Sequence, residues 1–427
     1  MDSAADIRAP GASEWRSGWT VVLAAFFGVS VAAMPTHAMG VLVKPITEAF
    51  GWTRAEISIV PLFVSIATLV LSPLVGLIVD RHGARRVVLL GVPLYAASLA
   101  MVSLSSGNLM LFYALYGLMA VVHPVVGPLI WSLGVASRFD NQRGLALGIS
   151  MAGMAALGTV TPILTQLALE QLGVDLIWIA LGLVAFVFAF PLAVLFFYDA
   201  KDLRMRRAGI GRRSPSRHKF EDVPRHSGHS FKQAFLSRRF GQVAMSFVIA
   251  AAVCGLFMIH FTSMLTDQGM GPREAALILG VMAPGAMIGR IAGGFLLDRF
   301  FAPVVASFTL LLPFLTCLLM LFAPLSTVLG VTIGLAIGFS LGTEGDTLPY
   351  LVARYFGLRS YGKIYGMLFG LYSLGFGAGS FAGGKIFEAT GSYRGAWTMF
   401  VLLLPVAIAL IATLGRYPTF AEDGTKA

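Results

Sequence analysis

The chain has 427 residues, of which 57% are hydrophobic and only 12% are charged, and its formal net charge is +10. Soluble globular chains carry about 25% charged residues, so the composition excludes a soluble enzyme or binding domain and indicates an integral membrane protein. The apolar runs are continuous and do not alternate, which excludes a transmembrane β-barrel. Only Cys254 and Cys317 are present, both inside apolar runs, so no disulfide framework or zinc site is expected.

Uncharged runs predict twelve spans in chain order. They lie near residues 18–43, 55–79, 86–106, 109–136, 144–169, 175–198, 240–265, 274–297, 303–323, 328–353, 361–385 and 396–415. The amino terminus lacks the order of features of a cleaved signal peptide, so the first run is expected to remain as a span. We therefore predict an all-α integral membrane protein with 12 transmembrane helices in two pseudo-symmetric six-helix bundles.

The distribution of basic residues predicts the orientation. If the amino terminus is cytoplasmic, most of the 31 Lys and Arg fall on the inner side. The basic residues left in outer loops are Lys44, Arg54, Arg273, Lys385 and Arg394. By the positive-inside rule we expect both termini in the cytoplasm. We expect the protein in the cell membrane, which in a bacterium is the inner membrane. The positive charge thus serves topology, and no nucleic-acid partner is expected.

One long polar segment, 199–239, divides the chain into a bundle at 1–198 and a second bundle at 240–427. It is rich in Arg, and a basic stretch beside a membrane attracts anionic lipid headgroups at about 1 kcal/mol per charge. A solvated tether that sets topology is the simpler interpretation, and lipid binding is the alternative.

The two predicted bundles share a sequence repeat. At a shift of 218 residues, Gly51 matches Gly269 and the pair Asp80–Arg81 matches Asp298–Arg299 at the end of a span. Halves repeated about an axis along the membrane normal suit a carrier that rocks one bundle against the other around a site at the midplane.

The repeated motif carries a family resemblance. Residues 76–86, GLIVDRHGARR, resemble the signature loop between the second and third helices of the major facilitator superfamily, and residues 294–299, GFLLDR, resemble its second copy. The resemblance implies a set of ion-paired gating residues at the cytoplasmic end. Its residues are Asp80, Arg81, Arg85, Asp298 and Arg299.

A second resemblance narrows the group. Residues 40–58 resemble the first loop of the monocarboxylate transporters and their bacterial relatives, which include oxalate:formate exchangers, and residues 342–357 resemble many bacterial members. It implies a monomeric secondary active transporter that moves an organic anion, a monocarboxylate with aromatic acids among the candidates, by symport with protons and without a cofactor. Carboxylate exchange and proton-coupled drug export are the alternatives. No catalytic nucleophile, metal cluster or nucleotide-binding loop indicates an enzyme.

Charged residues within spans are candidates for function, because each costs about 2.5–3.5 kcal/mol at a helix centre. Arg290 precedes Asp298 by eight residues, which places it about 12 Å from the helix end and near the midplane. A guanidinium stays protonated and grips a carboxylate with two hydrogen bonds, so Arg290 is the predicted substrate-binding residue. The resembling carriers have an Arg at this place; a permanent ion pair with Glu344 or Asp346 is the alternative role.

The sequence departs from the resembling carriers at two places. Animal monocarboxylate carriers have an Asp implicated in proton coupling one turn before this Arg, where this chain has Ala286. Oxalate carriers add a Lys within the eleventh helix, but Lys363 and Lys385 lie only near its ends here. A two-cation clamp for a dicarboxylate is therefore disfavoured, and Glu344 and Asp346 become the candidates for proton coupling, with a static structural pair as the alternative.

Three further residues are secondary candidates for the substrate site. His37 and His123 carry groups that titrate near physiological pH, and each could instead have a structural hydrogen-bonding role. Tyr372, on the eleventh predicted helix, could stack on an aromatic acid or serve only in packing.

Overall fold

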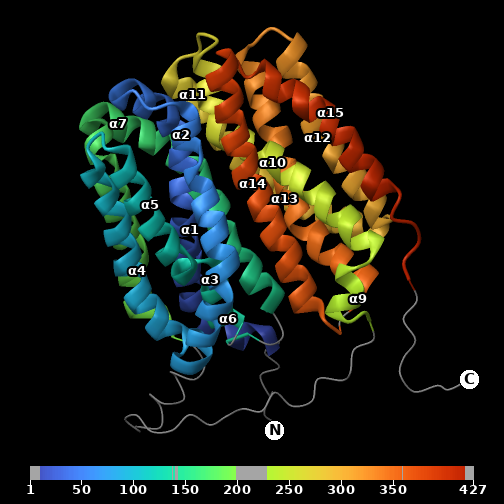
Figure 1. The fold of residues 1–427 in the computed structure, drawn as a ribbon. Helices are drawn as coiled ribbons and strands as arrows, with labels where there is room; N and C mark the ends of the chain where they lie inside the picture. Colours follow the sequence, from blue (N-terminus) through green and yellow to red (C-terminus); the bar gives the residue numbers. More distant parts are fainter. Residues whose placement is uncertain (1–9, 137, 140–142, 199–227, 358, 419–427) are drawn as a thin grey trace, which may run out of the picture. The chain divides into compact units, whose positions relative to one another are not determined.

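The fold is described from a computed structural model, in which residues 10–136, 138–139, 143–198, 228–357 and 359–418 are described. Most of the predicted linker, residues 199–227, lies outside the described residues. The predicted boundary at 198 is the last described residue before this gap. Helices account for nearly all of the described chain (Figure 1).

The helices of the first half are long and joined by short connections. They are α1 (Pro10–Phe50), α2 (Arg54–Ser58), α3 (Val60–His82), α4 (Ala84–Met101), α5 (Leu109–Val122), α6 (Pro128–Ala136) and α7 (Arg143–Phe196), with the 3-10 turns η1 (Val102–Ser105) and η2 (His123–Val126).

The described second half is also built of helices joined by short connections. Its helices are α9 (Phe231–Phe235), α10 (Arg238–Thr266), α11 (Pro272–Arg299), α12 (Ala302–Phe322), α13 (Thr327–Phe356), α14 (Tyr361–Thr390) and α15 (Arg394–Ala412). Since α10 begins at Arg238, the predicted end of the linker at 239 falls in the first turn of this helix.

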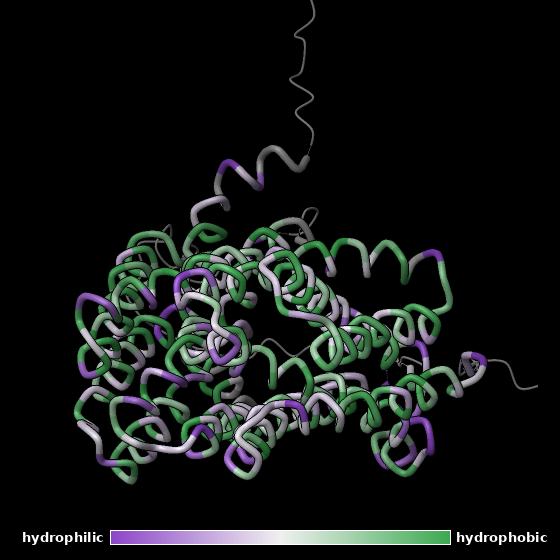
Figure 2. The backbone as a smooth tube through the Cα atoms, turned by 90° about the horizontal axis from the view of Figure 1, so that it is seen from above, coloured by the Kyte–Doolittle hydropathy of each residue, from purple (hydrophilic) through white to green (hydrophobic). Residues whose placement is uncertain are grey.

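Eleven helical segments in the described chain are long and apolar enough to cross a membrane. One of them, Ala146–Phe196, has 51 residues, about twice the number that a hydrocarbon core of about 30 Å requires. Gly173 interrupts it with φ of 74°, a left-handed conformation that glycine adopts without strain. The segment is therefore long enough for two consecutive membrane crossings. Hydrophobic residues predominate along the helices (Figure 2). The predicted all-α membrane fold is confirmed.

The described residues gather into two compact units. Unit 1 is drawn from Met1–Pro35, Val70–Leu157 and Asp175–Ser216, and unit 2 from Thr36–Leu69, Gly158–Val174 and Arg217–Ala427. Unit 2 thus holds all described helices of the second half together with α2 and parts of α1, α3 and α7. The division into 1–198 and 240–427 stays a prediction.

Glycines bring the helices of unit 2 close together. On α11 and α13, a Cβ added at Gly289, Gly338 or Gly342 would lie 2.0–2.2 Å from a backbone carbonyl oxygen of the facing helix. Such spacing of small residues lets helix backbones touch in a membrane, where hydrophobic burial does not drive association. The contact between α11 and α13 therefore fixes where the residues beside these glycines point.

Candidate functional site

Arg290 lies on α11, directly after the contact glycine Gly289, and its side chain is exposed. Its guanidinium Nη2 lies 3.2 Å from the point where a Cβ at Gly345 of α13 would stand. Among the described residues, no ion pair joins Arg290 to Glu344 or Asp346. The alternative of a permanent ion pair is therefore not seen in this structure.

The face of α11 that carries Arg290 differs from its most apolar exposed face. Met287, Ile288, Ile291 and Phe295 form an exposed apolar surface on α11. At about 100° per residue, Arg290 stands about 60° around the helix from Met287 and about 100–160° from the other three. Its electrostatic neighbours are Asp346 of α13 and Tyr365 and Tyr372 of α14. The guanidinium thus lies beside polar groups of unit 2, at the edge of the exposed apolar surface.

Glu344 is more deeply buried than Asp346. Its side chain is 3% exposed, and the Ser340 hydroxyl donates a hydrogen bond of 2.9 Å to its Oε1. The Cys254 thiol lies 3.8 Å from the same oxygen, and the Tyr372 hydroxyl lies beside the carboxyl. Its direct partners among the described residues are therefore neutral donors.

The two candidate carboxylates differ in surroundings because they are two residues apart, about 200° around α13. Glu344 points into the packing with α10 and α14, whereas Asp346 is half-buried and interacts with the charge of Arg290. A cavity of about 10 Å³ adjoins Glu344, lined also by Thr309 and Thr347, which is close to the smallest volume that holds one water.

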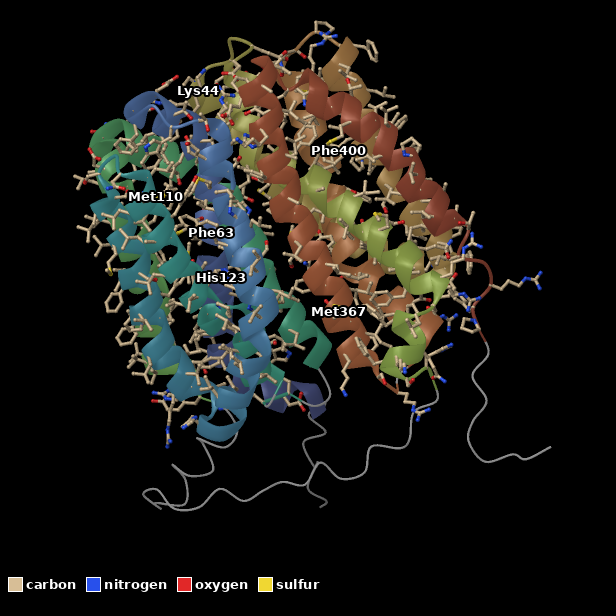
Figure 3. The ribbon with its side chains drawn as sticks, in the orientation of Figure 1. Lys44, Phe63, Met110, His123, Met367 and Phe400 are labelled. Atoms are coloured by element: carbon tan, nitrogen blue, oxygen red, sulfur yellow. The ribbon has the colours of Figure 1, made fainter. Side chains whose placement is uncertain are left out.

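His37 and His123 occupy separate units. His37 belongs to the part of α1 in unit 2, where its Nε2 lies 2.7 Å from the Cβ position of Gly158 of α7. His123 opens η2 in unit 1 (Figure 3), with Nε2 3.1 Å from the carbonyl oxygen of Ala32 and the ring edge-on to Tyr95. A structural hydrogen bond is thus present for His123.

Of the predicted gating residues, Arg85 has the best-described role. Its Nη1 and Nη2 donate hydrogen bonds of 2.9 Å to the carbonyl oxygens of Phe197 and Val194, and its guanidinium stacks on Tyr198 at 3.6 Å. Arg85 thus caps the end of α7 within unit 1, where a positive charge is favourable. Arg299 is exposed and lies over Phe295. The side chains of Asp80, Arg81 and Asp298 lie outside the described residues.

The structure contains a cluster of charged side chains that the sequence did not predict. Lys44 and Arg54 were expected only as basic residues of outer loops. Arg54, 7% exposed, donates from Nη1 and Nη2 to the two carboxylate oxygens of Asp267, over 2.5 and 2.8 Å. Lys44 contacts the same carboxylate at 3.1 Å, at the end of α1 near the top of Figure 3. We call Lys44, Arg54 and Asp267 the latch. All three belong to unit 2, but Lys44 and Arg54 come from the first half of the sequence.

A hydrogen-bond chain continues inward from the latch. Arg54 Nη1 donates to the Tyr393 hydroxyl over 3.0 Å, and that hydroxyl lies 2.9 Å from Nδ1 of His260. Because Nε2 of His260 faces the carbonyl oxygen of Ser380 at 2.9 Å, this nitrogen carries the proton and Nδ1 accepts from Tyr393. The buried Arg54 thus donates three hydrogen bonds, two to Asp267 and one to Tyr393.

Two titratable groups of the latch region lie outside the spans. Burial acts to raise the pKa of the Asp267 carboxyl, but the hydrogen bonds and charges of Arg54 and Lys44 outweigh it and hold this pKa below its usual value. Burial raises the pKa of the Tyr393 hydroxyl. Asp267 is therefore ionised, and Tyr393 neutral, throughout the physiological pH range.

A second pair in unit 2 has similar geometry but a different environment. Arg273 of α11 donates to both carboxylate oxygens of Glu170 of α7, at 2.5–3.1 Å, and its side chain is 66% exposed. No three His, Cys, Asp or Glu side chains in the described part of the chain come together as a metal site.

Comparisons with known proteins agree with this fold. The family model described as Major Facilitator Superfamily matches residues 21–380. The MFS-type transporter 1 of Ophiocordyceps sp. is 25% identical over 359 residues, which cover 80% of this chain and 72% of that one. Monocarboxylate transporter 13 of Bos taurus is 24% identical over 420 residues, covering 96% and 92%.

Among solved structures, the crystal structure of the nucleoside transporter NupG superposes with a TM-score of 0.73 at 12% identity, over 93% of this chain and 100% of that one. This likeness concerns the fold alone. With the family match over most of the sequence, it shows that the chain belongs to the major facilitator superfamily of membrane transporters and resembles its monocarboxylate transporters at low identity.

Proposed function

We propose that this transporter moves an organic monocarboxylate through the membrane by alternating access, with Arg290 as the anion-binding group and protons as the coupled ion. The observation that carries the proposal is the state of Arg290: an exposed guanidinium on a spanning helix, with no ion-pair partner among the described residues. A charge at this depth is costly unless a ligand or water engages it, and a carboxylate fits its paired donors.

The neighbours of Arg290 favour a small or aromatic acid. Gly345 leaves room beside the guanidinium, and Tyr365 and Tyr372 lie on the helix that flanks it. Tyrosine rings offer flat apolar surface with a hydroxyl at the edge. The similarity to a protein named monocarboxylate transporter 13 supports the same substrate class.

Glu344 is the proposed proton carrier, and Asp346 the residue that senses the substrate. Asp346 interacts with the charge of Arg290, so a bound carboxylate would compete with it for the guanidinium. Glu344, buried among the hydroxyls of Ser340 and Tyr372, can be accommodated as a neutral acid, and the adjoining small cavity has room for one water. Tyr372 lies between the two functions, since it contacts Glu344 and is influenced by Arg290.

The distribution of Lys and Arg supports an orientation with both termini in the cytoplasm, as in a bacterial inner membrane. The latch then lies at the outer end of the spans. Its contacts join segments of the first half to α10 and α15 within unit 2, and they hold that end closed. Release of the latch is the proposed step that opens the site to the outside, and we expect a monomer to complete the cycle.

The decisive experiment is uptake by the purified protein in proteoliposomes, with a panel of labelled acetate, lactate, pyruvate, benzoate, formate and oxalate. Arg290→Gln is expected to lower uptake of the preferred acid at least tenfold, and Arg290→Lys to retain part of it as a point charge. Arg359→Gln, which removes an exposed charge from a connection, is the matched control and should transport like the parent.

Three outcomes would contradict the assignment. Unchanged carboxylate uptake in Arg290→Gln would make Arg290 structural. Uptake that needs an acid inside the vesicles but no proton gradient would favour the exchanger, and proton-driven movement of cationic drugs in place of acids would favour the exporter.

A further inference from the structure

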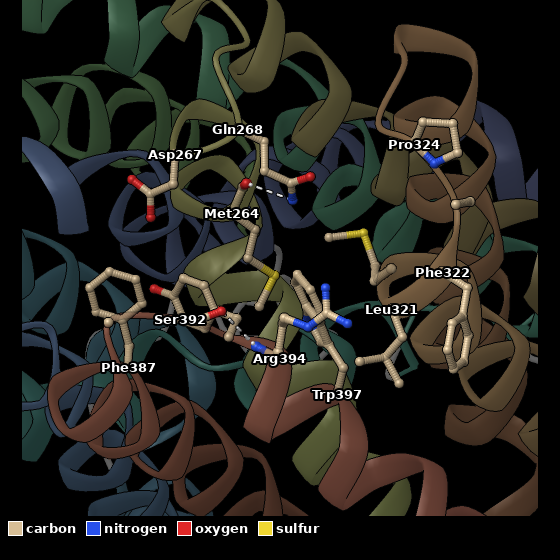
Figure 4. Close-up of a pocket in the computed structure, with 14 residues that line it drawn as sticks. Met264, Asp267, Gln268, Leu321, Phe322, Pro324, Phe387, Ser392, Arg394 and Trp397 are labelled. Atoms are coloured by element: carbon tan, nitrogen blue, oxygen red, sulfur yellow. Dashed lines mark hydrogen bonds between the residues drawn. The ribbon is translucent and has the colours of Figure 1, made fainter.

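A second pocket lies at the latch end of unit 2, apart from Arg290. It has a volume of about 600 Å³, within the range of small-molecule sites, and lies where α10 ends, α12 ends and α15 begins (Figure 4). Its apolar walls include Met264, Met320 and Trp397. Its lining also includes Asp267 of the latch and Tyr393, but the proposed transport mechanism places no ligand in this pocket.

Two features of the pocket favour a negatively charged group. Arg394 lies among the lining side chains in Figure 4, and no carboxylate or other acceptor contacts its guanidinium among the described residues. Arg394 is also the first residue of α15, a 19-residue helix whose first N–H donates to the Ser392 hydroxyl over 3.2 Å and whose N-cap residue Tyr393 makes no side-chain capping bond. The positive end of the helix dipole adds to the guanidinium charge.

Trp397, one helix turn after Arg394, belongs to the apolar wall of the pocket. Its side chain is only 5% exposed, and its indole N–H is enclosed by protein, so the ring and not this N–H meets a ligand in the pocket. Asp267, the acid of the pocket wall, is already neutralised by Arg54 and Lys44.

We infer that this pocket binds an amphipathic anion, with its acid group at Arg394 and the start of α15 and its apolar body against Trp397, Met264 and Met320. Such a ligand is either an organic acid from the medium or the headgroup and upper chain of an anionic phospholipid. Both present the same chemistry, one negative group on an apolar body. The inference does not depend on Arg290 or on the transported substrate.

The test uses 4-bromobenzoate as a probe, because a bromine atom in contact with an indole quenches its fluorescence. The full-length protein in detergent is titrated, and the part of the signal due to Trp397 is obtained by difference from Trp397→Phe. We expect saturable quenching of that part, with Kd at least tenfold higher in Arg394→Gln and intermediate in Arg394→Lys. The neutral analogue 4-bromobenzyl alcohol should bind at least tenfold more weakly than the acid.

The matched control is Lys385→Gln. It removes one exposed positive charge near the carboxyl end of α14, outside the pocket lining, and should leave the Kd of the probe within twofold of the parent value. The titrations are repeated in Arg290→Gln, where the quenching should persist; this separates the pocket from the transport site. Binding of dihexanoyl phosphatidylglycerol that depends on Arg394, with displacement of the probe, would support the site and identify a lipid as occupant. Quenching that is equal in Arg394→Gln and the parent, or absent from Trp397, would overturn the inference.

Discussion

The guanidinium of Arg54 and the carboxylate of Asp267 form a two-point ion pair between residues 213 positions apart in the sequence. Arg273 and Glu170 form a pair of the same type, also between the two halves of the sequence and also in unit 2. The two pairs differ mainly in exposure, at 7% for the Arg54 side chain and 66% for that of Arg273. This contrast separates the effect of burial from that of geometry.

The first prediction is that Arg54→Gln destabilises the protein and Arg273→Gln does not. Loss of one partner of a buried pair leaves an uncompensated charge, whereas an exposed pair is worth about 0–1 kcal/mol. Because Asp267 is one-quarter exposed and keeps Lys44, we expect a cost of about 1–3 kcal/mol for Arg54→Gln. Thermal unfolding in one detergent would show a clear loss of Tm for Arg54→Gln alone.

The double variant Arg54→Gln/Asp267→Asn supplies the control. If the pair is energetically coupled, its loss of stability will be smaller than the sum of the two single losses. Simple additivity would mean that Arg54 stabilises the fold through Tyr393 and packing instead.

The second prediction concerns pH. The pKa of Asp267 is held below its usual value in the folded protein, so its contribution to stability is complete above the unfolded pKa and is lost only as pH falls through the lower, folded pKa. The Tm difference between the parent and Asp267→Asn should therefore be constant from pH 8 to pH 5. A difference that shrinks between pH 7 and pH 5 would show that Asp267 titrates there, and the latch would then be a candidate pH sensor.

The fold was predictable because a bilayer imposes strong rules on sequence. Apolar runs predicted the spans. One difference is that α7 continues through the two spans predicted at 144–169 and 175–198, because the chain turns at Gly173 without a loop between them. The small residues Gly334, Gly338 and Gly342 recur at every fourth position of α13, a spacing typical of helix contacts, and each faces the backbone of α11. Local patterns of this kind report on burial and contact.

The candidate site was only partly predictable. Spacing from the helix end predicted the depth of Arg290, but the sequence did not indicate which of Glu344 and Asp346 is buried. The latch was missed because Arg54 and Asp267 look like ordinary loop charges until the chain is folded. Its signal in the sequence was the presence of Lys44 and Arg54 within the 40–58 motif, and that motif does not name their partner Asp267.

The third prediction tests the space beside Arg290. A Cβ at Gly345 would lie 3.2 Å from the guanidinium, whereas a Cβ at Gly366 of α14 would meet nothing within 4 Å. Gly345→Val is therefore expected to displace Arg290 and to raise the KM for the transported acid several-fold, while Gly366→Val leaves KM unchanged. Uptake kinetics in proteoliposomes would measure both. An equal effect of the two substitutions would indicate a general effect on helix movement and remove the steric argument.

The fourth prediction assigns Arg85 a structural part in addition to any gating. It binds the carbonyl oxygens of Val194 and Phe197 and stacks on Tyr198, and a planar fork is needed for both. Arg85→Lys keeps the charge but loses this geometry, so we expect it to lower Tm nearly as much as Arg85→Gln. The exposed neighbour Arg86 is the control, and Arg86→Gln should leave Tm unchanged. Full stability of Arg85→Lys would show that charge at the end of α7 is sufficient.

The last prediction separates the two acidic residues of α13. In Glu344→Gln the amide replaces a carboxyl that contacts neutral donors, so the fold should survive, but no proton can be taken up at this position. We therefore expect loss of uptake driven by a proton gradient, with exchange of labelled for unlabelled acid retained. Asp346→Asn removes a negative charge that competes for Arg290, so it should instead lower the KM of the acid and keep the response to the gradient. Both variants are measured in the same vesicles with and without an imposed gradient. If gradient-driven uptake persists in Glu344→Gln and disappears in Asp346→Asn, the proton site is the half-buried residue near Arg290, and the buried cluster of Ser340, Cys254 and Tyr372 is only structural.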